Sequence, residues 1–126
     1  MAHVLIVGIG GFIGSILRYW LGGITHRWGQ DAFPAGTLVV NVLGCFVLGA
    51  VMYLVEYREF FSAELRLFVT IGILGGFTTF STFGYETFAL LRDSEHLQAL
   101  ASVTANVVVG TAAVAGGWIA AKAAGI

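Results

Sequence analysis

Four long apolar runs, separated by short polar connectors, constrain this sequence more than any other feature. They cover about Val4 to Ile24, Gly36 to Val55, Ala63 to Leu91 and Leu97 to Ala121. A helix rises about 1.5 Å per residue, so about 20 apolar residues cross a hydrocarbon core of about 30 Å. Each run reaches that length. We therefore predict an all-α membrane protein whose four transmembrane helices form a single domain, residues 1–126.

The composition agrees with a membrane protein. Of the 126 residues 58% are hydrophobic and 10% are charged, whereas soluble domains carry about 25% charged residues. The net charge of −1 gives no indication of nucleic-acid binding. Cys45 is the only cysteine, which excludes an intrachain disulfide and argues against a thiolate metal site. The partner that the composition indicates is the lipid bilayer.

The third apolar run contains its own interruption. As one straight helix, its span from residue 63 to residue 91 would reach roughly 44 Å, well beyond the hydrocarbon core. Residues 75–83 read Gly-Gly-Phe-Thr-Thr-Phe-Ser-Thr-Phe, and adjacent glycines disfavour a helix. We therefore predict a broken third helix. Backbone groups freed in lipid must find partners, and freed carbonyls at such a break are able to hold a cation.

Aromatic and hydroxyl side chains form adjacent stripes after this interruption. At about 100° per residue, one stripe holds Phe80, Phe83 and Thr87, and its neighbour holds Thr79, Thr82 and Glu86. A phenyl ring has a positive edge, so a small anion could lie against these rings. Hydrogen bonds from Asn41, Ser81 or Thr82 would complete its shell. The alternative is an ordinary packed aromatic stripe. An ionised Glu86 in the path would repel an anion, so it lies near the mouth, pairs with a cation or is protonated.

The first run carries a stripe with a spacing of four residues, which holds Gly10, Gly14, Arg18 and Gly22. Small residues at this spacing allow helix backbones to approach closely, which predicts a packing seam. Arg18 either extends to the membrane interface, attracts anions or fixes the fold.

Two further stripes with the same spacing contain asparagines. The second run holds Thr37, Asn41, Cys45 and Gly49, and the fourth holds Ser102, Asn106 and Gly110. An asparagine in a membrane must be satisfied, so Asn41 either bonds to another helix or donates to a passing anion. We interpret the fourth-run stripe first as a polar packing seam and second as a pathway lining.

The charges near the ends of the runs do not select an orientation. One side of the membrane would hold Arg58, Arg66 and Lys122, and the other would hold Arg18, Arg27 and Arg92. The positive-inside rule gives no preference for such a balance. Either finer details decide the orientation, or the chain inserts both ways and forms antiparallel homodimers.

Three motifs together resemble the Fluc (CrcB) family of bacterial fluoride channels over essentially the whole chain. They are the seam of Gly10, Gly14 and Arg18, the Asn41-Val42-Leu43-Gly44 motif, and the stretch from Gly75 to Phe83. The last is highly specific, whereas the other two alone would be weak.

The resemblance implies a dual-topology antiparallel homodimer with two fluoride pores. It also implies one central sodium ion (Na+), bound by backbone carbonyls that match Gly75 and Thr78. The matching pore residues are Asn41, Phe80 and Phe83, with a polar track at Ser81 and Thr82 and with Glu86 toward its far end. Such a protein exports fluoride passively from the cytoplasm across the bacterial plasma (inner) membrane and is not an enzyme.

The residues themselves favour small anions in general and do not reveal fluoride. Two other functions stay open on the sequence. A small four-span proton-coupled multidrug exporter needs a carboxylate deep in its cavity, and Glu86 is the acidic side chain well inside a run. A non-transporting membrane assembly subunit would use the glycine seams for packing alone.

Overall fold

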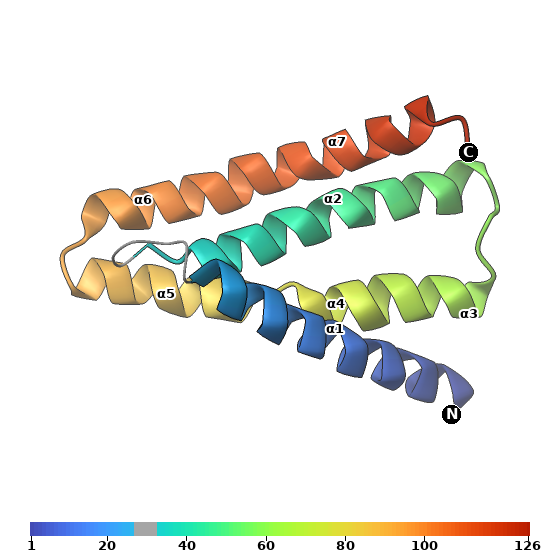
Figure 1. The fold of residues 1–126 in the computed structure, drawn as a ribbon, viewed down its shortest axis with the longest axis horizontal. Helices are drawn as coiled ribbons and strands as arrows, with labels where there is room; N and C mark the ends of the chain where they lie inside the picture. The colour runs from blue at the N-terminus through green and yellow to red at the C-terminus, as the bar shows by residue number, and fades with distance from the viewer. Residues whose placement is uncertain (27–32) are drawn as a thin grey trace.

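The structure is a computed structural model that describes residues 1–26 and 33–126. All regular elements in these residues are helical, and Figure 1 shows their arrangement. In order they are α1 (Ala2–His26), α2 (Ala35–Tyr57), α3 (Ala63–Arg66), η1 (Leu67–Leu74), α4 (Gly75–Phe77), α5 (Phe80–Arg92), α6 (His96–Thr104), η2 (Ala105–Val109) and α7 (Gly110–Ala123). The two η elements are π-helical.

These elements join into four spans, each long and apolar enough to cross a membrane. The spans are Ala2–Thr25, Ala35–Tyr57, Ala63–Arg92 and His96–Ala123. They confirm the four predicted helices, and the chain is a multi-pass membrane protein. Arg27, which entered the charge balance above, lies outside the described residues.

The spans pack as two pairs. The second span lies along the fourth through α2 and α7, and α1 lies along η1 and α4 of the third span. Both termini lie at the same end of the molecule as the connector between α2 and α3, whereas the α5–α6 connector lies at the other end (Figure 1). Four consecutive spans require their connectors to alternate between the two ends of the molecule in this way.

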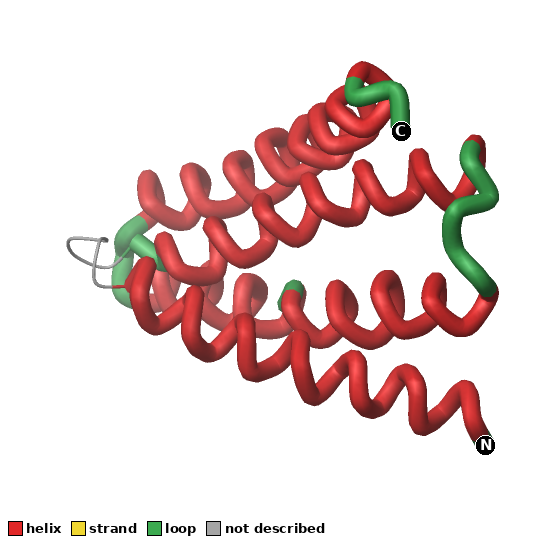
Figure 2. The backbone as a smooth tube through the Cα atoms, turned by 45° about the vertical axis from the view of Figure 1, so that its right-hand side comes forward, coloured by secondary structure: helices red, strands yellow, loops and turns green. Residues whose placement is uncertain are grey.

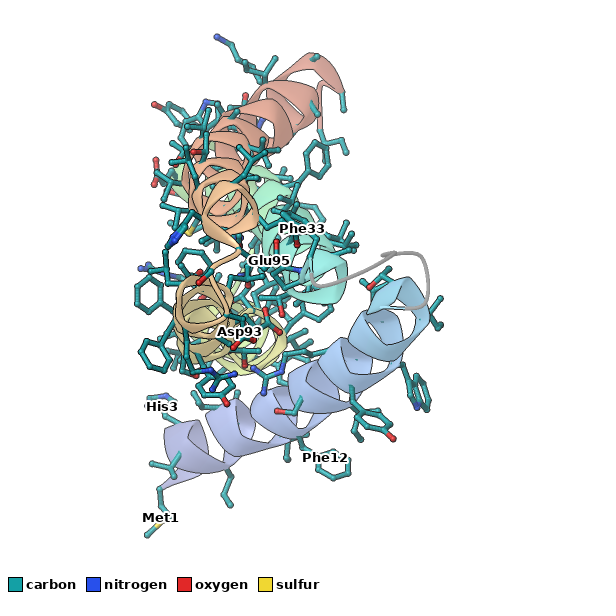
Figure 3. The ribbon with its side chains drawn as sticks, turned by 90° about the vertical axis from the view of Figure 1, so that its left-hand side faces the viewer. Met1, His3, Phe12, Phe33, Asp93 and Glu95 are labelled. Carbon is teal, nitrogen blue, oxygen red and sulfur yellow. The ribbon has the colours of Figure 1, made fainter. Side chains whose placement is uncertain are left out.

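The glycine seam of α1 brings two backbones together. Gly10 and Gly14 are buried against the third span. A Cβ atom at Gly10 would lie 2.6 Å from the Phe68 carbonyl oxygen, and one at Gly14 would overlap the Ile73 carbonyl. Only glycine permits this approach, so Gly10 and Gly14 form a packing seam, whereas nothing lies within 4 Å of a Cβ atom at Gly22. The opposite face of α1 is apolar and exposed in a single copy, and Phe12, which is 68% exposed, points away from the other helices (Figure 3).

The third span is broken at Thr78 and Thr79, both of which are extended. Their φ and ψ angles are −83° and 158° for Thr78 and −150° and 116° for Thr79. Figure 2 shows this segment as a short loop inside an otherwise helical span. The broken third helix is therefore confirmed, but the break lies just after the two glycines, which are themselves helical.

Gly76 serves packing rather than unwinding. A Cβ atom at Gly76 would lie 2.7 Å from the carbonyl oxygen of Gly11 on α1. The small size of Gly76 therefore allows the first span to reach the third span beside the break. The unwinding has a different cause, which is a set of hydrogen bonds described below.

We predict that Gly14→Ala lowers the free energy of unfolding by about 1–3 kcal/mol, because an added methyl group overpacks the seam. Denaturant or thermal unfolding of the detergent-solubilised protein measures the change. Gly8→Ala is the matched control on the same helix, since nothing lies within 4 Å of a Cβ atom there. Equal stability of the two variants would contradict the seam.

Candidate functional site

The peptide at the break is held by a side-chain amide from the second span. The Thr79 N–H donates to Asn41 Oδ1 at 2.9 Å, and Asn41 Nδ2 donates to the Thr79 carbonyl oxygen at 3.1 Å. One side chain therefore satisfies both polar groups of a residue that has left the helical pattern. This is what a break inside lipid requires.

Thr79 also caps the helix that follows. Its Oγ1 accepts from the Thr82 N–H at 3.2 Å and donates to Thr82 Oγ1 at 3.0 Å. A hydroxyl that accepts from the backbone N–H three residues later makes a standard N-cap interaction. The sequence Thr79-Phe80-Ser81-Thr82 thus starts α5 anew instead of continuing α4.

Carbonyls before the break lose their helical donors as a result. In an α-helix the carbonyl of residue i accepts from the N–H of residue i+4. The Thr79 N–H would serve Gly75 and the Thr82 N–H would serve Thr78, but both are diverted to side chains. The carbonyls of Gly75 and Thr78 therefore lack these helical donors, and they are the two that the resemblance implies for a sodium ion.

The Thr78 carbonyl has a donor from another span. Arg18 Nη1 lies 3.4 Å from the Thr78 carbonyl oxygen, a long hydrogen bond that brings the guanidinium of α1 to the break. Of the alternatives for Arg18, this contact supports a role in fixing the fold. Gly44 is buried beside it, and a Cβ atom there would overlap the Thr78 methyl group. Gly44 therefore leaves room for the break.

A second asparagine continues the hydrogen bonds from Asn41. Asn41 Nδ2 also donates to Asn106 Oδ1 at 3.0 Å, and Asn106 Nδ2 donates to the Ser102 carbonyl oxygen at 2.9 Å. Both N–H groups of Asn41 are thus engaged. Of the two alternatives for Asn41, the structure shows the interhelical hydrogen bond, and donation to an anion stays a prediction.

A cavity of about 330 Å³ opens beside the break. It brings together the predicted residues Asn41, Gly44, Gly75, Thr78, Phe80 and Phe83, together with Asn106. The widened segments η1 and η2 both contribute to its wall through Thr70 and Val107. Thus π-helical turns border this site, as they do at many functional sites.

The two phenylalanines differ in exposure. Phe83 is 9% exposed and Phe80 is 82% exposed, and their ring centroids lie 5.6 Å apart at an interplanar angle of 64°. The edge of one ring therefore faces the other ring. Phe80 stands on an open face of the chain, so a single copy does not enclose the cavity.

A second cavity of about 570 Å³ lies on the other side of the break, toward the α5–α6 connector. Its wall includes Arg18, Thr82 and Glu86, and Thr79 lines both cavities. Thr37 Oγ1 donates to Glu86 Oε1 at 2.9 Å. The structure thus places Glu86 in this second cavity, apart from the phenylalanines.

Asp93 lines the same cavity near the end of the span, in the region labelled in Figure 3. Arg92 donates to Asp93 at 3.0 Å, and this hydrogen bond lowers the pKa of the Asp93 carboxyl below its usual value. Because both side chains are exposed, their pairing contributes little to stability. It does keep the negative charge at this mouth beside a cation.

The structure separates Ser81 from the other predicted residues. Ser81 is exposed and is not among the residues that line either cavity. The sequence analysis in turn missed Gln98, which precedes Ser102 and Asn106 at the same spacing of four. Among the described residues, Gln98 Oε1 and Ser102 Oγ are buried without a hydrogen-bond partner. Extending the stripe by one step would have found Gln98.

Comparison with known proteins agrees with this geometry. Residues 5–118 match the family described as "CrcB-like protein, Camphor Resistance (CrcB)". The chain belongs to the CrcB family. This family membership covers all four spans and confirms the resemblance found in the sequence.

Proteins named as fluoride-specific ion channels are similar to the chain over most of their length. The protein named "Fluoride-specific ion channel FluC 1" of Methanosarcina acetivorans is 51% identical over 124 residues, 96% of this chain and 92% of the relative. "Fluoride-specific ion channel FluC 3" of Methanosarcina barkeri is 50% identical, with coverages of 90% and 86%. "Fluoride-specific ion channel FluC" of Geobacter sulfurreducens is 47% identical, with coverages of 88% and 92%. These names are names of ion channels and not of enzymes.

We predict that Thr79→Val lowers the free energy of unfolding by about 1 kcal/mol, because it removes the N-cap hydroxyl while keeping the shape. Unfolding measurements in detergent report the change, and amide exchange at Thr82 reports its location. Thr79→Ser keeps the hydroxyl and serves as the control. If Thr79→Val left the exchange of the Thr82 amide unaltered, the cap would not matter.

Proposed function

We propose that this CrcB protein is a fluoride-selective channel that exports fluoride passively from the cytoplasm across the plasma (inner) membrane. The observation that carries the proposal is the 51% identity to a fluoride-specific ion channel over nearly the full length of both chains. The polar break and the aromatic pair beside it support the same conclusion. No enzymatic step is needed, because a permeating ion only exchanges its water for protein partners and is then released.

The ring edges and polar groups at the first cavity support an anion pathway. Fluoride is strongly hydrated, so a pore must replace its water with other partners. The edges of Phe80 and Phe83 carry partial positive charge, and the Asn41 amide adds donor groups. An anion that met the Asn41 amide would have to displace one of its two present acceptors.

An antiparallel homodimer would complete this pathway. Phe80 is 82% exposed in a single copy, and closed two-fold pairs are the commonest assemblies. A second copy against this face would enclose the Phe80 ring and repeat the cavity, giving two pores. The balance of Lys and Arg between the two sides supports insertion in both directions.

The residues at the break fit a central sodium ion. The carbonyls of Gly75 and Thr78 are freed from the helix and stand beside the open cavity. Oxygen atoms suit a hard cation, and a full shell of ligands needs more than these two. Two copies facing each other would together supply a fuller shell. When bound, sodium would add positive charge near the pathway.

The experiment that tests the function uses pure protein in liposomes loaded with fluoride or with chloride. Fast release of fluoride and little release of chloride is the expected result. No ion release would indicate a packing subunit instead. Uptake of a lipophilic cation driven by a pH gradient would indicate an exporter.

We predict that Phe80→Ile and Phe83→Ile each slow fluoride efflux by about tenfold or more, which corresponds to about 1.4 kcal/mol of barrier. The substitution keeps an apolar side chain and removes the ring edge. Phe88→Ile is the control on the same helix, because Phe88 is exposed and lines neither cavity at the break. Unchanged efflux in both test variants would remove the aromatic wall from the pathway.

We also predict that copies face both ways in the membrane. Glu64→Cys and Glu95→Cys, each in a Cys45→Ala background, place one thiol at opposite ends of the chain in exposed positions. A membrane-impermeant thiol reagent added to intact cells should label about half of the copies of each variant, because two-fold antiparallel pairs contain both orientations equally. Labelling of one variant only would rule out dual topology.

A further inference from the structure

We infer that Asn106 is a positioning residue that acts through Asn41 to hold the break open. The fourth span thereby controls whether the Gly75 carbonyl in the third span stays free. The hydrogen bonds that carry this inference exist within one chain. A role of the freed Gly75 carbonyl in ion passage rests on the proposed function.

The four groups form one chain of hydrogen bonds. It runs from the Ser102 carbonyl to Asn106 at 2.9 Å, from Asn106 to Asn41 at 3.0 Å, and from Asn41 to the Thr79 peptide at 2.9 and 3.1 Å. Three spans are thus connected through two side-chain amides. This series of hydrogen bonds begins and ends on backbone groups, so the orientation of both side-chain amides is fixed.

The orientation of each amide follows from its neighbour. A carbonyl oxygen only accepts hydrogen bonds, so the Ser102 carbonyl selects the NH₂ end of Asn106. The Oδ1 atom of Asn106 is then turned toward Asn41 and selects the NH₂ end of Asn41. That leaves Asn41 Oδ1 facing the Thr79 N–H. A rotated Asn41 amide would place its oxygen against two other acceptors.

The consequence reaches the backbone of the third span. As long as Asn41 Oδ1 accepts from the Thr79 N–H, that N–H is withheld from Gly75, its partner in a continuous helix. The terminal torsion of asparagine is broad, so Asn41 alone would be a loose clamp. Asn106 supplies the third bond that fixes it.

The test is hydrogen exchange at single amides of the purified protein, read by NMR. Asn106→Leu keeps the volume and removes the acceptor. We expect exchange of the Thr79 N–H to quicken about fivefold, as expected for the loss of one net hydrogen bond. Exchange at Val40, a buried residue of α2, should stay as in the wild type, which separates a local effect from general destabilisation.

Two variants complete the design. Asn106→Asp, studied at a pH where its carboxyl is protonated, keeps a donor for the Ser102 carbonyl and an oxygen that accepts from Asn41, and should retain slow exchange at Thr79. Thr111→Val on the same span removes a hydroxyl that bonds only to its own helix, at the Val107 carbonyl, and should also leave Thr79 unchanged. Unaltered exchange at Thr79 in Asn106→Leu, or equal acceleration in Asn106→Leu and Thr111→Val, would overturn the inference.

A measurement on the wild-type protein keeps the inference testable if Asn106→Leu does not fold. Both side-chain amide protons of Asn41 should exchange slowly, because both are engaged. Rapid exchange of either proton would show that the clamp is absent. These readouts do not depend on transport, so a protein that failed to release fluoride would contradict the proposed function and leave this inference standing.

Discussion

The structure depends on the requirement that a peptide inside lipid keep its hydrogen bonds. At Thr79 the chain leaves the helix inside a span that is apolar enough to cross a membrane, where lipid cannot replace lost partners. The Asn41 amide supplies an acceptor and a donor in the geometry of a neighbouring peptide. Without it, each unsatisfied backbone group would cost several kcal/mol, and a continuous helix would be the better solution. The remaining features of the site surround this contact, in which the Asn41 side chain replaces the helical partners of the Thr79 backbone.

Packing around the break depends on glycines that let the helix backbones approach closely. Gly10, Gly14 and Gly76 let α1 reach the third span, and Gly44 lets the second span accept the Thr78 methyl group. Membrane helices lack a strong hydrophobic drive toward one another, so close backbone contact has to supply the attraction. The helices that border the break are therefore held by contacts that tolerate no added side-chain carbon.

Much of this fold follows from the sequence, because its signals are local. Run length alone predicts the four spans, and the spacing of Gly10, Gly14 and Arg18 predicts one helix face. The position of the break was harder to predict. Gly75 and Gly76 suggested unwinding, but it occurs at Thr78 and Thr79, since the deciding bonds come from Asn41 and from the Thr79 hydroxyl. Helical periodicity likewise does not reveal that Asn106 and Asn41 meet, because that contact depends on how two separate spans pack.

The position of Thr79 between the two cavities has a further consequence. Thr79 is part of the wall of each, and Asn41, which bonds to its backbone, lines the first. A change of shape at this one residue would therefore reach both cavities at once.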